Sequence, residues 1–160
     1  MVVVVLRRAQ PHEIDHAVDV WSAANADSRL LGHPSHLRTW SQADGALLAT
    51  AVDEGHVVAM GLAVPGRAND GTGEVIEGWS HLTGMAVLPD YQGQGLGGRL
   101  LDYIIAEVKA TGSTQATLWT HSTNIRARAL FESRGQRASG RMVRDEAGDE
   151  LIHFEGVLHD

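Results

Sequence analysis

The chain has 160 residues, 43% of them hydrophobic and 21% charged, which is typical of one globular domain with its own core. A formal net charge of −7 disfavours nucleic acid as the main partner, and no apolar run is long enough to cross a membrane. The absence of cysteine excludes disulfides, thiolate metal sites and thiol nucleophiles. It also fits a reducing compartment, so we expect a cytoplasmic protein.

The first half of the chain predicts a strand, two helices and a β-hairpin. Residues 2–6 form a β-branched apolar run followed by arginines and no cleavage site, which favours a buried strand over a signal peptide. Apolar residues at helical spacing predict a helix over 11–24 that begins at a proline. The segment 25–40 is less regular and ends in a short helix. Two apolar runs, 46–52 and 56–64, flank an Asp-Glu-Gly turn and predict a hairpin.

The second half alternates strands and helices after a polar, glycine-rich loop at 65–73. No repeat, low-complexity tract or linker divides the chain, so we expect residues 1–160 to form a single domain with a mixed α/β fold. The expected elements are a long strand over 74–88, a helix over 99–109, a strand over 114–121, a helix over 124–134, and two final strands over 136–144 and 150–158.

Four glycines fall within six residues of the stretch YQGQGLGGR, residues 91–99, just where a helix begins. Gly93, Gly95 and Gly98 match the dinucleotide pattern G-x-G-x-x-G, but no acidic residue follows at the distance where the ribose ligand should lie. One alternative is a tight turn whose glycines serve packing only. The other, which we favour, is a phosphate site, because bare backbone N–H groups at a helix N-terminus attract an anion.

The same stretch resembles the pyrophosphate loop of the GNAT superfamily of acetyl-CoA-dependent N-acetyltransferases. Residues 92–97 (QGQGLG) fit the family pattern (Gln/Arg)-x-x-Gly-x-(Gly/Ala). Residues 84–91 (GMAVLPDY) are similar to the family's fourth strand and the turn after it. Residues 124–135 (NIRARALFESRG) are similar to its Asn-x-x-Ala-x-x-Leu-(Tyr)-x-x-x-Gly segment. Both motifs stand in the family's order, so the resemblance extends over nearly the whole chain.

The resemblance implies a fold and a cosubstrate. The fold is α/β (α+β), with a mixed, mostly antiparallel central sheet of about six or seven strands, about four flanking helices, and strands 4 and 5 splayed apart. Acetyl-CoA is the implied cosubstrate, with its pantetheine arm in the gap between those strands. The residues carried over for binding it are Met85, Ala86, Val87, Gln92, Gly93, Gln94, Gly95, Leu96, Gly97, Gly98, Asn124 and Phe131. Asn124 also suits a helix N-cap, and the two roles are compatible.

Attack on a thioester requires a neutral amine, and therefore a base near the gap. His81 is the candidate base because an imidazole accepts a proton near neutral pH, and Glu77 is the second candidate. His81 could equally be a strand residue with no chemistry. Strand alternation supports its candidacy provided that no bulge near Gly84 inverts the faces, since one face then carries Glu77, Trp79, His81, Thr83 and Met85.

A general acid is missing at its usual place. Family members often use a Tyr in the later helical segment, where this chain has Phe131, which has no proton to give. His121, at the end of the strand over 114–121, is expected to play a structural or substrate-contacting role. The histidines form no recognisable metal-binding pattern, so no metal is expected.

The sequence suggests three candidate functions. The leading one is an N-acetyltransferase that moves acetyl from acetyl-CoA to a primary amine, of a small molecule or a protein N-terminus, by direct attack in a ternary complex. The alternative is a non-catalytic acyl-CoA-binding or sensing domain, and the missing Tyr supports it. A dinucleotide-dependent oxidoreductase is disfavoured by the absent acidic ligand. No nucleic acid or membrane partner is expected, and the strand over 150–158 suggests a homodimer formed through it.

Overall fold

A computed structural model describes residues 3–24, 34–144 and 148–159, and it has the expected mixed α/β architecture. Expectations for residues 1–2, 25–33, 145–147 and 160 lie outside the described residues. Within the described residues there are seven strands: β1 (Val5–Arg8), β2 (Leu47–Asp53), β3 (His56–Arg67), β4 (Val75–Val87), β5 (Gln115–His121), β6 (Arg137–Arg144) and β7 (Glu150–Val157). The same residues contain four α-helices: α1 (Ile14–Ala24), α2 (Pro34–Ser41), α3 (Leu96–Ala110) and α4 (Ile125–Glu132).

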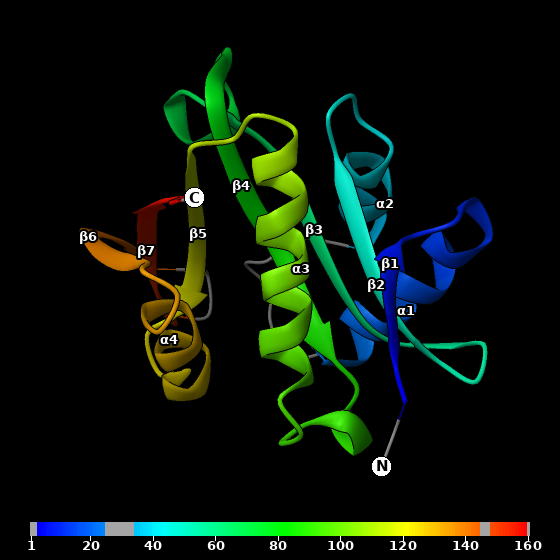
Figure 1. Cartoon of the computed structure of the whole chain (residues 1–160). Coiled ribbons are helices and arrows are strands. Elements are labelled where there is room, and N and C mark those ends of the chain that lie inside the picture. The colour runs from blue at the N-terminus through cyan, green and yellow to red at the C-terminus, as the bar shows by residue number, and fades with distance from the viewer. Residues whose placement is uncertain (1–2, 25–33, 145–147, 160) are drawn as a thin grey trace.

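The strands form one sheet in the order β1-β2-β3-β4-β5-β7-β6. Each neighbouring pair is antiparallel except β4 and β5, which run parallel because the crossover helix α3 connects them. Figure 1 shows α3 lying across the sheet, with β4 and β5 moving apart toward the end where the helix begins. The mostly antiparallel sheet, the helix count and the splayed central strands confirm the expected fold.

Three element boundaries differ from the sequence prediction. The first strand lies at Val5–Arg8 rather than over 2–6, because its partner β2 pairs with those residues. Strand β3 continues to Arg67, so part of the predicted glycine-rich loop is paired with β4. Helix α3 begins at Leu96, so two of the four glycines lie inside the helix.

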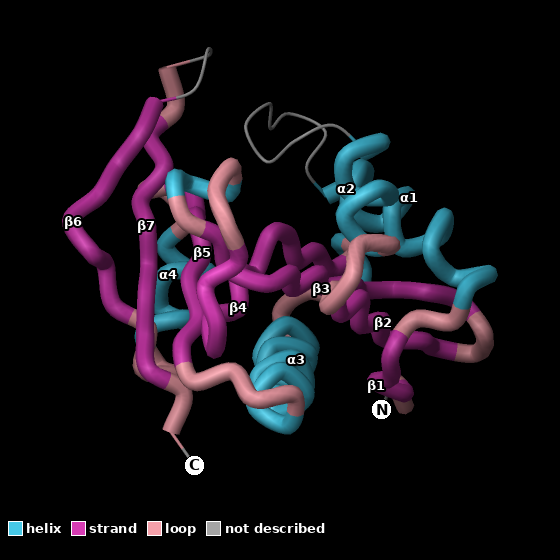
Figure 2. The backbone as a smooth tube through the Cα atoms, turned by 90° about the horizontal axis from the view of Figure 1, so that it is seen from above, coloured by secondary structure: helices cyan, strands magenta, loops and turns pink. Residues whose placement is uncertain are grey.

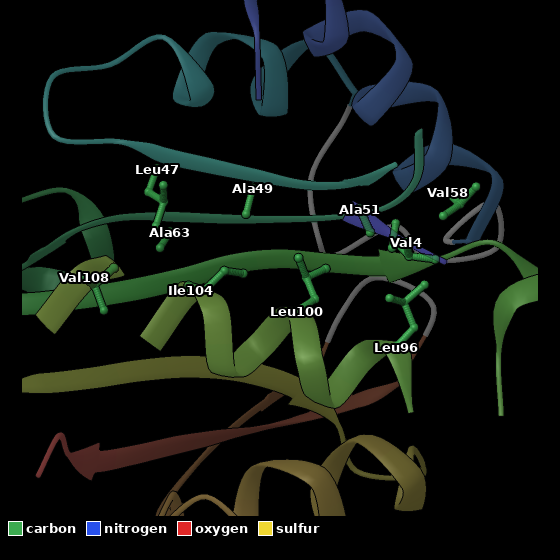
Figure 3. Close-up of a cluster of buried hydrophobic side chains, with 11 residues drawn as sticks. Val4, Leu47, Ala49, Ala51, Val58, Ala63, Leu96, Leu100, Ile104 and Val108 are labelled. Atoms are coloured by element: carbon green, nitrogen blue, oxygen red, sulfur yellow. The ribbon is translucent and has the colours of Figure 1, made fainter. Parts of the chain in front are cut away.

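The helices cover the two faces of the sheet, as Figure 2 shows for α3 on one side and α1 and α2 on the other. On the α3 side, Leu96, Leu100, Ile104 and Val108 from the helix pack against small strand residues such as Ala49 (Figure 3). Small residues on the strands let the helix approach closely and exclude water from a continuous apolar layer.

A second core lies on the α1/α2 side. Val18 and Trp21 of α1 and Leu37 of α2 are almost fully buried against the other face of β2, β3 and β4. The two cores hold the central strands from both faces. Toward β5, β7 and β6, a third cluster of Leu101, Leu118, Phe131 and Phe154 joins α3 and α4 to the sheet.

A bulge in β4 changes which residues share a face. Leu62 of β3 pairs with Gly84, whereas the next β3 residue, Ala63, pairs with Leu82, so Thr83 is an extra residue. Leu82 and Met85 therefore both pack against the α3 side. An added Cβ on Gly84 would meet the Trp21 ring of α1. The prediction that His81 and Met85 share a face is wrong, because the bulge restarts the alternation between them.

The final strand is not an edge of the sheet. Strand β7 pairs with β5 along one side and with β6 along the other. A second copy therefore cannot extend the sheet at an edge of β7, and a homodimer that uses this strand stays a prediction. The outer strands of this sheet are β1 and β6.

Candidate active site

The parallel strands β4 and β5 are paired only over a short stretch. Trp79–Leu82 lie in register with Gln115–Leu118, and beyond this point β4 continues to Val87 while β5 pairs with β7. Among the described residues no strand pairs with β4 on that side over 83–87, so its backbone groups form an open edge there. Met85, Ala86 and Val87 lie on this edge, where the sequence placed the cofactor arm.

The glycine-rich loop follows directly at the end of β4. A short 3-10 turn, Pro89–Tyr91, leads into it, and the Gln92 Nε2 donates to the Val87 carbonyl oxygen at 2.9 Å. The Tyr91 hydroxyl donates to the Asp53 carboxylate at 2.6 Å. That hydrogen bond, together with partial desolvation, raises the pKa of Tyr91, so the phenol stays a donor at neutral pH. These contacts fix the loop against the β2–β3 hairpin and the end of β4.

The four positions differ in why they carry glycine. Gly93 and Gly95 adopt φ values of +77° and +79°, and an added Cβ on either would meet no atom within 4 Å. Glycine is therefore needed at both positions for the backbone conformation, and the space beside them is open. An added Cβ on Gly97 would make ordinary contacts, 3.9 Å from Leu130 and from Val87. One on Gly98 would lie 2.6 Å from the Arg134 guanidinium. An added side chain at Gly98 would thus have to displace the end of the Arg134 side chain, whereas nothing packs beside the two glycines at the start of the loop.

The first N–H groups of α3 follow directly after this open loop. The first intrahelical bond joins the Arg99 N–H to the Gly95 carbonyl at 3.1 Å, so the residues before Arg99 have no acceptor within the helix. An open helix N-terminus carries partial positive charge. Together with glycines that leave room for a ligand, it can receive a phosphate group. Of the other residues predicted to bind the cosubstrate here, Gln94 is exposed and Leu96 is buried in the core.

His81 lies at the point where the two strands begin to separate. Its Nδ1 is 2.7 Å from the Thr117 hydroxyl oxygen on β5, directly across the ladder. Ala116 and Leu118, the neighbours of Thr117, line a small cavity of about 30 Å³ under α3, so Thr117 and His81 face the α1/α2 side. The hydrogen bond fixes the orientation of the imidazole at the narrow end of the gap.

The two catalytic candidates are not brought together. Glu77 is exposed and lines a groove of about 380 Å³ with Trp79 and with Glu107 near the C-terminal end of α3. The glycine loop lies at the other end of that helix, which is about 22 Å long at 1.5 Å per residue. Glu77 therefore lies far from the loop, whereas His81 is next to the gap.

The later helical segment combines a cap with a core residue. The Asn124 Oδ1 accepts a hydrogen bond from the Ala127 N–H at 3.1 Å, so Asn124 is the N-cap of α4. Phe131 is 5% exposed and packs against Phe154, with ring centroids 6.2 Å apart. The Phe131 ring also lines the cavity under α3, beside Leu82 and Leu118.

Sequence reasoning missed the polar side chains that β5, β6 and β7 add on the α1/α2 side. Thr117 is hydrogen-bonded to His81, and the Ser139 hydroxyl lies within hydrogen-bond distance of His153. His153 and Arg141 each contact the Trp119 ring. The sequence offered no signal for them, because they come together only through the pairing of three strands. His121, at the end of β5, pairs with Leu151 of β7 at the far end of the same ladder.

Two features are absent from the described residues. No three His, Cys, Asp or Glu side chains of the described chain lie close enough together to hold a metal ion. None of the helices in the part of the chain that the structure describes has the length and apolarity needed to span a membrane.

Comparison with known proteins agrees with this geometry. Residues 14–136 match the model of the Acetyltransferase (GNAT) family. A 56-residue segment is 48% identical to the [ribosomal protein bS18]-alanine N-acetyltransferase of Escherichia coli K12, covering 34% of this chain. That match spans only 36% of the relative's length.

Solved structures of low sequence identity share the fold. The ribosomal-protein-S18-alanine N-acetyltransferase of Escherichia coli superposes with a TM-score of 0.79 at 21% identity, covering 99% of this chain and 96% of that one. The yncA protein of Salmonella typhimurium, solved with its cofactor acetyl-CoA, gives a TM-score of 0.80 at 19% identity, covering 99% and 95%. The family match covers most of the chain, and it includes the open β4 edge, the glycine loop and α4. The chain therefore belongs to the GNAT family of acetyltransferases.

Proposed function

We propose that the protein transfers the acetyl group of acetyl-CoA to a primary amine, of a small molecule or a protein N-terminus, by direct attack in a ternary complex. The observation that carries this proposal is the open backbone edge of β4 over 83–87, which leads directly into an open helix N-terminus. A pantetheine arm offers amides that suit a strand edge, and a pyrophosphate suits the start of a helix.

The chain supplies binding groups for each part of such a cosubstrate. Backbone groups of Met85, Ala86 and Val87 pair with the amides of the arm. Backbone N–H groups of the loop over 93–98 bind the pyrophosphate, where the space beside Gly93 and Gly95 is open. Asn124 holds the start of α4, and Phe131 provides an apolar wall.

His81 is the proposed base. The amine nitrogen bonds to the thioester carbonyl carbon, the carbon–sulfur bond breaks, and the amine proton passes to the imidazole. A backbone N–H on the β4 edge stabilises the charge that develops on the carbonyl oxygen. Because Phe131 cannot donate a proton, the leaving thiolate takes its proton from water. Glu77 is the second candidate, and it would have to act through water because it lies away from the gap.

The acceptor is proposed only as a primary amine. The relatives named as alanine N-acetyltransferases of a ribosomal protein support testing peptides with an N-terminal alanine. Other GNAT structures of the same fold include an aminoglycoside 6'-acetyltransferase, which supports testing small amines as well. A cytoplasmic location also stays a proposal and rests on the cysteine-free composition.

The alternative is a non-catalytic acyl-CoA-binding domain. It is favoured by Phe131, which stands where a proton-donating Tyr is expected and has no proton to give. The deciding experiment measures free thiol released from acetyl-CoA with a panel of amines and peptides, alongside calorimetry with acetyl-CoA. Thiol release that depends on the amine supports the transferase. Tight binding without amine-dependent release supports the binding domain, and no binding at all contradicts both.

A further inference from the structure

The small cavity between α3 and the sheet begins where β4 and β5 separate. Its volume is about 30 Å³, and Leu82 and Leu118 line it from the two strands. These residues form the last β4–β5 pair before the gap, so one end of the cavity lies at the narrow end of the gap. Phe131 of α4 also lines it. The cavity is therefore next to the place where the proposed function puts the thioester.

The cavity extends away from the gap along the paired part of the two strands. Ser80 and Ala116 also line it, and they pair with each other two residues before Leu82 and Leu118. Two residues of a parallel strand span about 6.6 Å, so the lining continues about that far beyond the gap. On the helix side it is covered by Leu101, Ile104, Ile105 and Val108. A covered apolar space of this shape suits a short hydrocarbon chain.

A polar side chain marks the far end of the cavity. Gln136 lines the cavity and is 3% exposed, and its buried Oε1 has no hydrogen-bond partner among the described residues. An added Cβ on Gly156 would lie 2.6 Å from the Gln136 Nε2, so the amide packs against β7 at this glycine. Gly156 pairs with Ala116, which places the amide at the end away from the gap. A carbon chain gains nothing by covering an unpaired amide oxygen, so Gln136 limits the chain length.

The cavity and the proposed base lie on opposite sides of the sheet. His81 is hydrogen-bonded to Thr117 and faces the α1/α2 side, whereas its neighbour Leu82 lines the cavity on the α3 side. An amine that approaches His81 therefore does not compete for space with a chain in the cavity.

We propose that this cavity receives the end of the acyl chain, so that the protein also uses propionyl-CoA and butyryl-CoA as acyl donors. One water-sized group needs about 10–15 Å³ of such space, so a cavity of about 30 Å³ has room for about two carbon groups beyond acetyl. The inference deepens the proposed function and rests on it, because the gap defines where the thioester lies.

The bonds that change are those of acetyl transfer. The amine nitrogen bonds to the acyl carbonyl carbon and the carbon–sulfur bond breaks. The amine proton passes to His81, and the thiolate takes its proton from water. Only the chain beyond the carbonyl carbon differs between donors, so a comparison of donors isolates the contribution of the cavity.

The test measures by calorimetry, without an amine, the affinity for acetyl-, propionyl-, butyryl- and hexanoyl-CoA. We expect Kd to fall about fourfold for each of the first two added methylenes, the usual effect of burying one, and to stop falling at hexanoyl-CoA. Ala116→Val should bring the affinities for acetyl- and butyryl-CoA together, because the added methyl groups fill the cavity. Ala138→Val is the matched control, since Ala138 is an exposed strand residue outside the cavity lining, and it should leave the series unchanged.

A second variant decides independently of Ala116→Val. Gln136→Ala lengthens the cavity at its far end, so hexanoyl-CoA should then bind more tightly than butyryl-CoA. Equal or weaker binding of propionyl- and butyryl-CoA than of acetyl-CoA, or a gain that survives Ala116→Val, overturns the inference and leaves the proposed acetyl transfer intact. If no amine is acylated by any donor, the proposed function fails, and the binding series alone decides whether the cavity holds the acyl chain.

Discussion

His81 and Met85 lie on opposite faces of β4, although they are four positions apart, a spacing that puts two residues of a regular strand on the same face. The extra residue Thr83 in the pairing with β3 causes this, and it leaves Met85 packed toward α3 while His81 bonds to Thr117 on the other side. Met85 is thus a core residue whose backbone lies on the open edge. His81 is on the side of the sheet where the rings of Trp119 and His153 meet.

The first prediction concerns His81. If its neutral imidazole is the base, kcat/KM should rise with pH as the imidazole loses its proton. His81→Ala should remove that rise and lower kcat/KM about 100-fold, with acetyl-CoA affinity nearly unchanged. His121→Ala should have a smaller effect, because His121 lies at the far end of β5. A His81→Ala enzyme with the wild-type rate and pH profile would exclude His81 from the mechanism.

The second prediction concerns Gly95. Gly95→Asp should abolish acetyl-CoA binding measured by calorimetry, because the added carboxylate would occupy the open phosphate space and repel the pyrophosphate. Gly95→Asn is the matched control, since asparagine has a similar shape and also tolerates a positive φ, but carries no charge. The aspartate should therefore weaken binding much more than the asparagine. Equal losses in the two folded variants would contradict a phosphate at this position.

The third prediction uses Gly97, which lies in the first turn of α3. Gly97→Ala should keep acetyl-CoA binding, because the added methyl makes only ordinary contacts with Leu130 and Val87. It should also raise the free energy of unfolding by about 0.5–1 kcal/mol, since alanine is the better helix former. Denaturant titration measures this change. A strong loss of stability would show that the helix start is packed more tightly than the contacts indicate.

The fourth prediction concerns Gln92, whose side chain donates to the Val87 carbonyl. Gln92→Leu removes that hydrogen bond, which is worth about 1 kcal/mol, and should raise the KM for acetyl-CoA about fivefold by loosening the loop. Gln94→Leu is the control, because Gln94 makes a longer contact of 3.3 Å to the exposed Asp90 carbonyl, and it should change KM less. Equal effects of the two substitutions would argue against a positioning role for Gln92.

The fifth prediction concerns pH and stability through Glu13, a buried carboxylate that accepts from Arg7 at 2.6 Å and from the Gln10 N–H at 2.9 Å. Burial by itself raises the pKa of Glu13, but these hydrogen bonds outweigh burial and hold it below the ordinary value. A lowered pKa stabilises the fold above the unfolded-state value of about 4.3, and this stability is lost as pH falls through the lower folded value.

Glu13→Gln should therefore lower the thermal midpoint at pH 7 and flatten its decline below about pH 4.3. The measurement is a series of thermal unfolding curves between pH 3 and pH 7. Asp15→Asn is the matched control, because the Asp15–Arg38 pair lies at the surface and should contribute little. If the thermal midpoint of Glu13→Gln falls at low pH as steeply as that of the wild type, another carboxylate is responsible for the fall.

The sequence by itself determined the order of the elements and the place of the glycine loop. Local signals carry this information: apolar periodicity in α3, the turn between β2 and β3, and glycines at the start of a helix depend on neighbouring residues. The same signals placed Asn124 at the start of α4, where it caps the helix. The ends of β1 and β3 differ from the prediction, because pairing with a partner strand decides where each of them begins and ends.

Only the tertiary structure decided which side chains meet. The face of His81 relative to Met85 depends on a bulge in the pairing of β4 with β3, and strand alternation alone cannot reveal it. Gly98 differs from Gly95 because the Arg134 guanidinium lies beside Gly98, whereas no atom lies beside Gly95. The contacts among Trp119, Ser139, Arg141 and His153 join residues from β5, β6 and β7, and β7 lies between the other two although it is last in the chain. Such contacts link residues far apart in the sequence, so no local pattern records them.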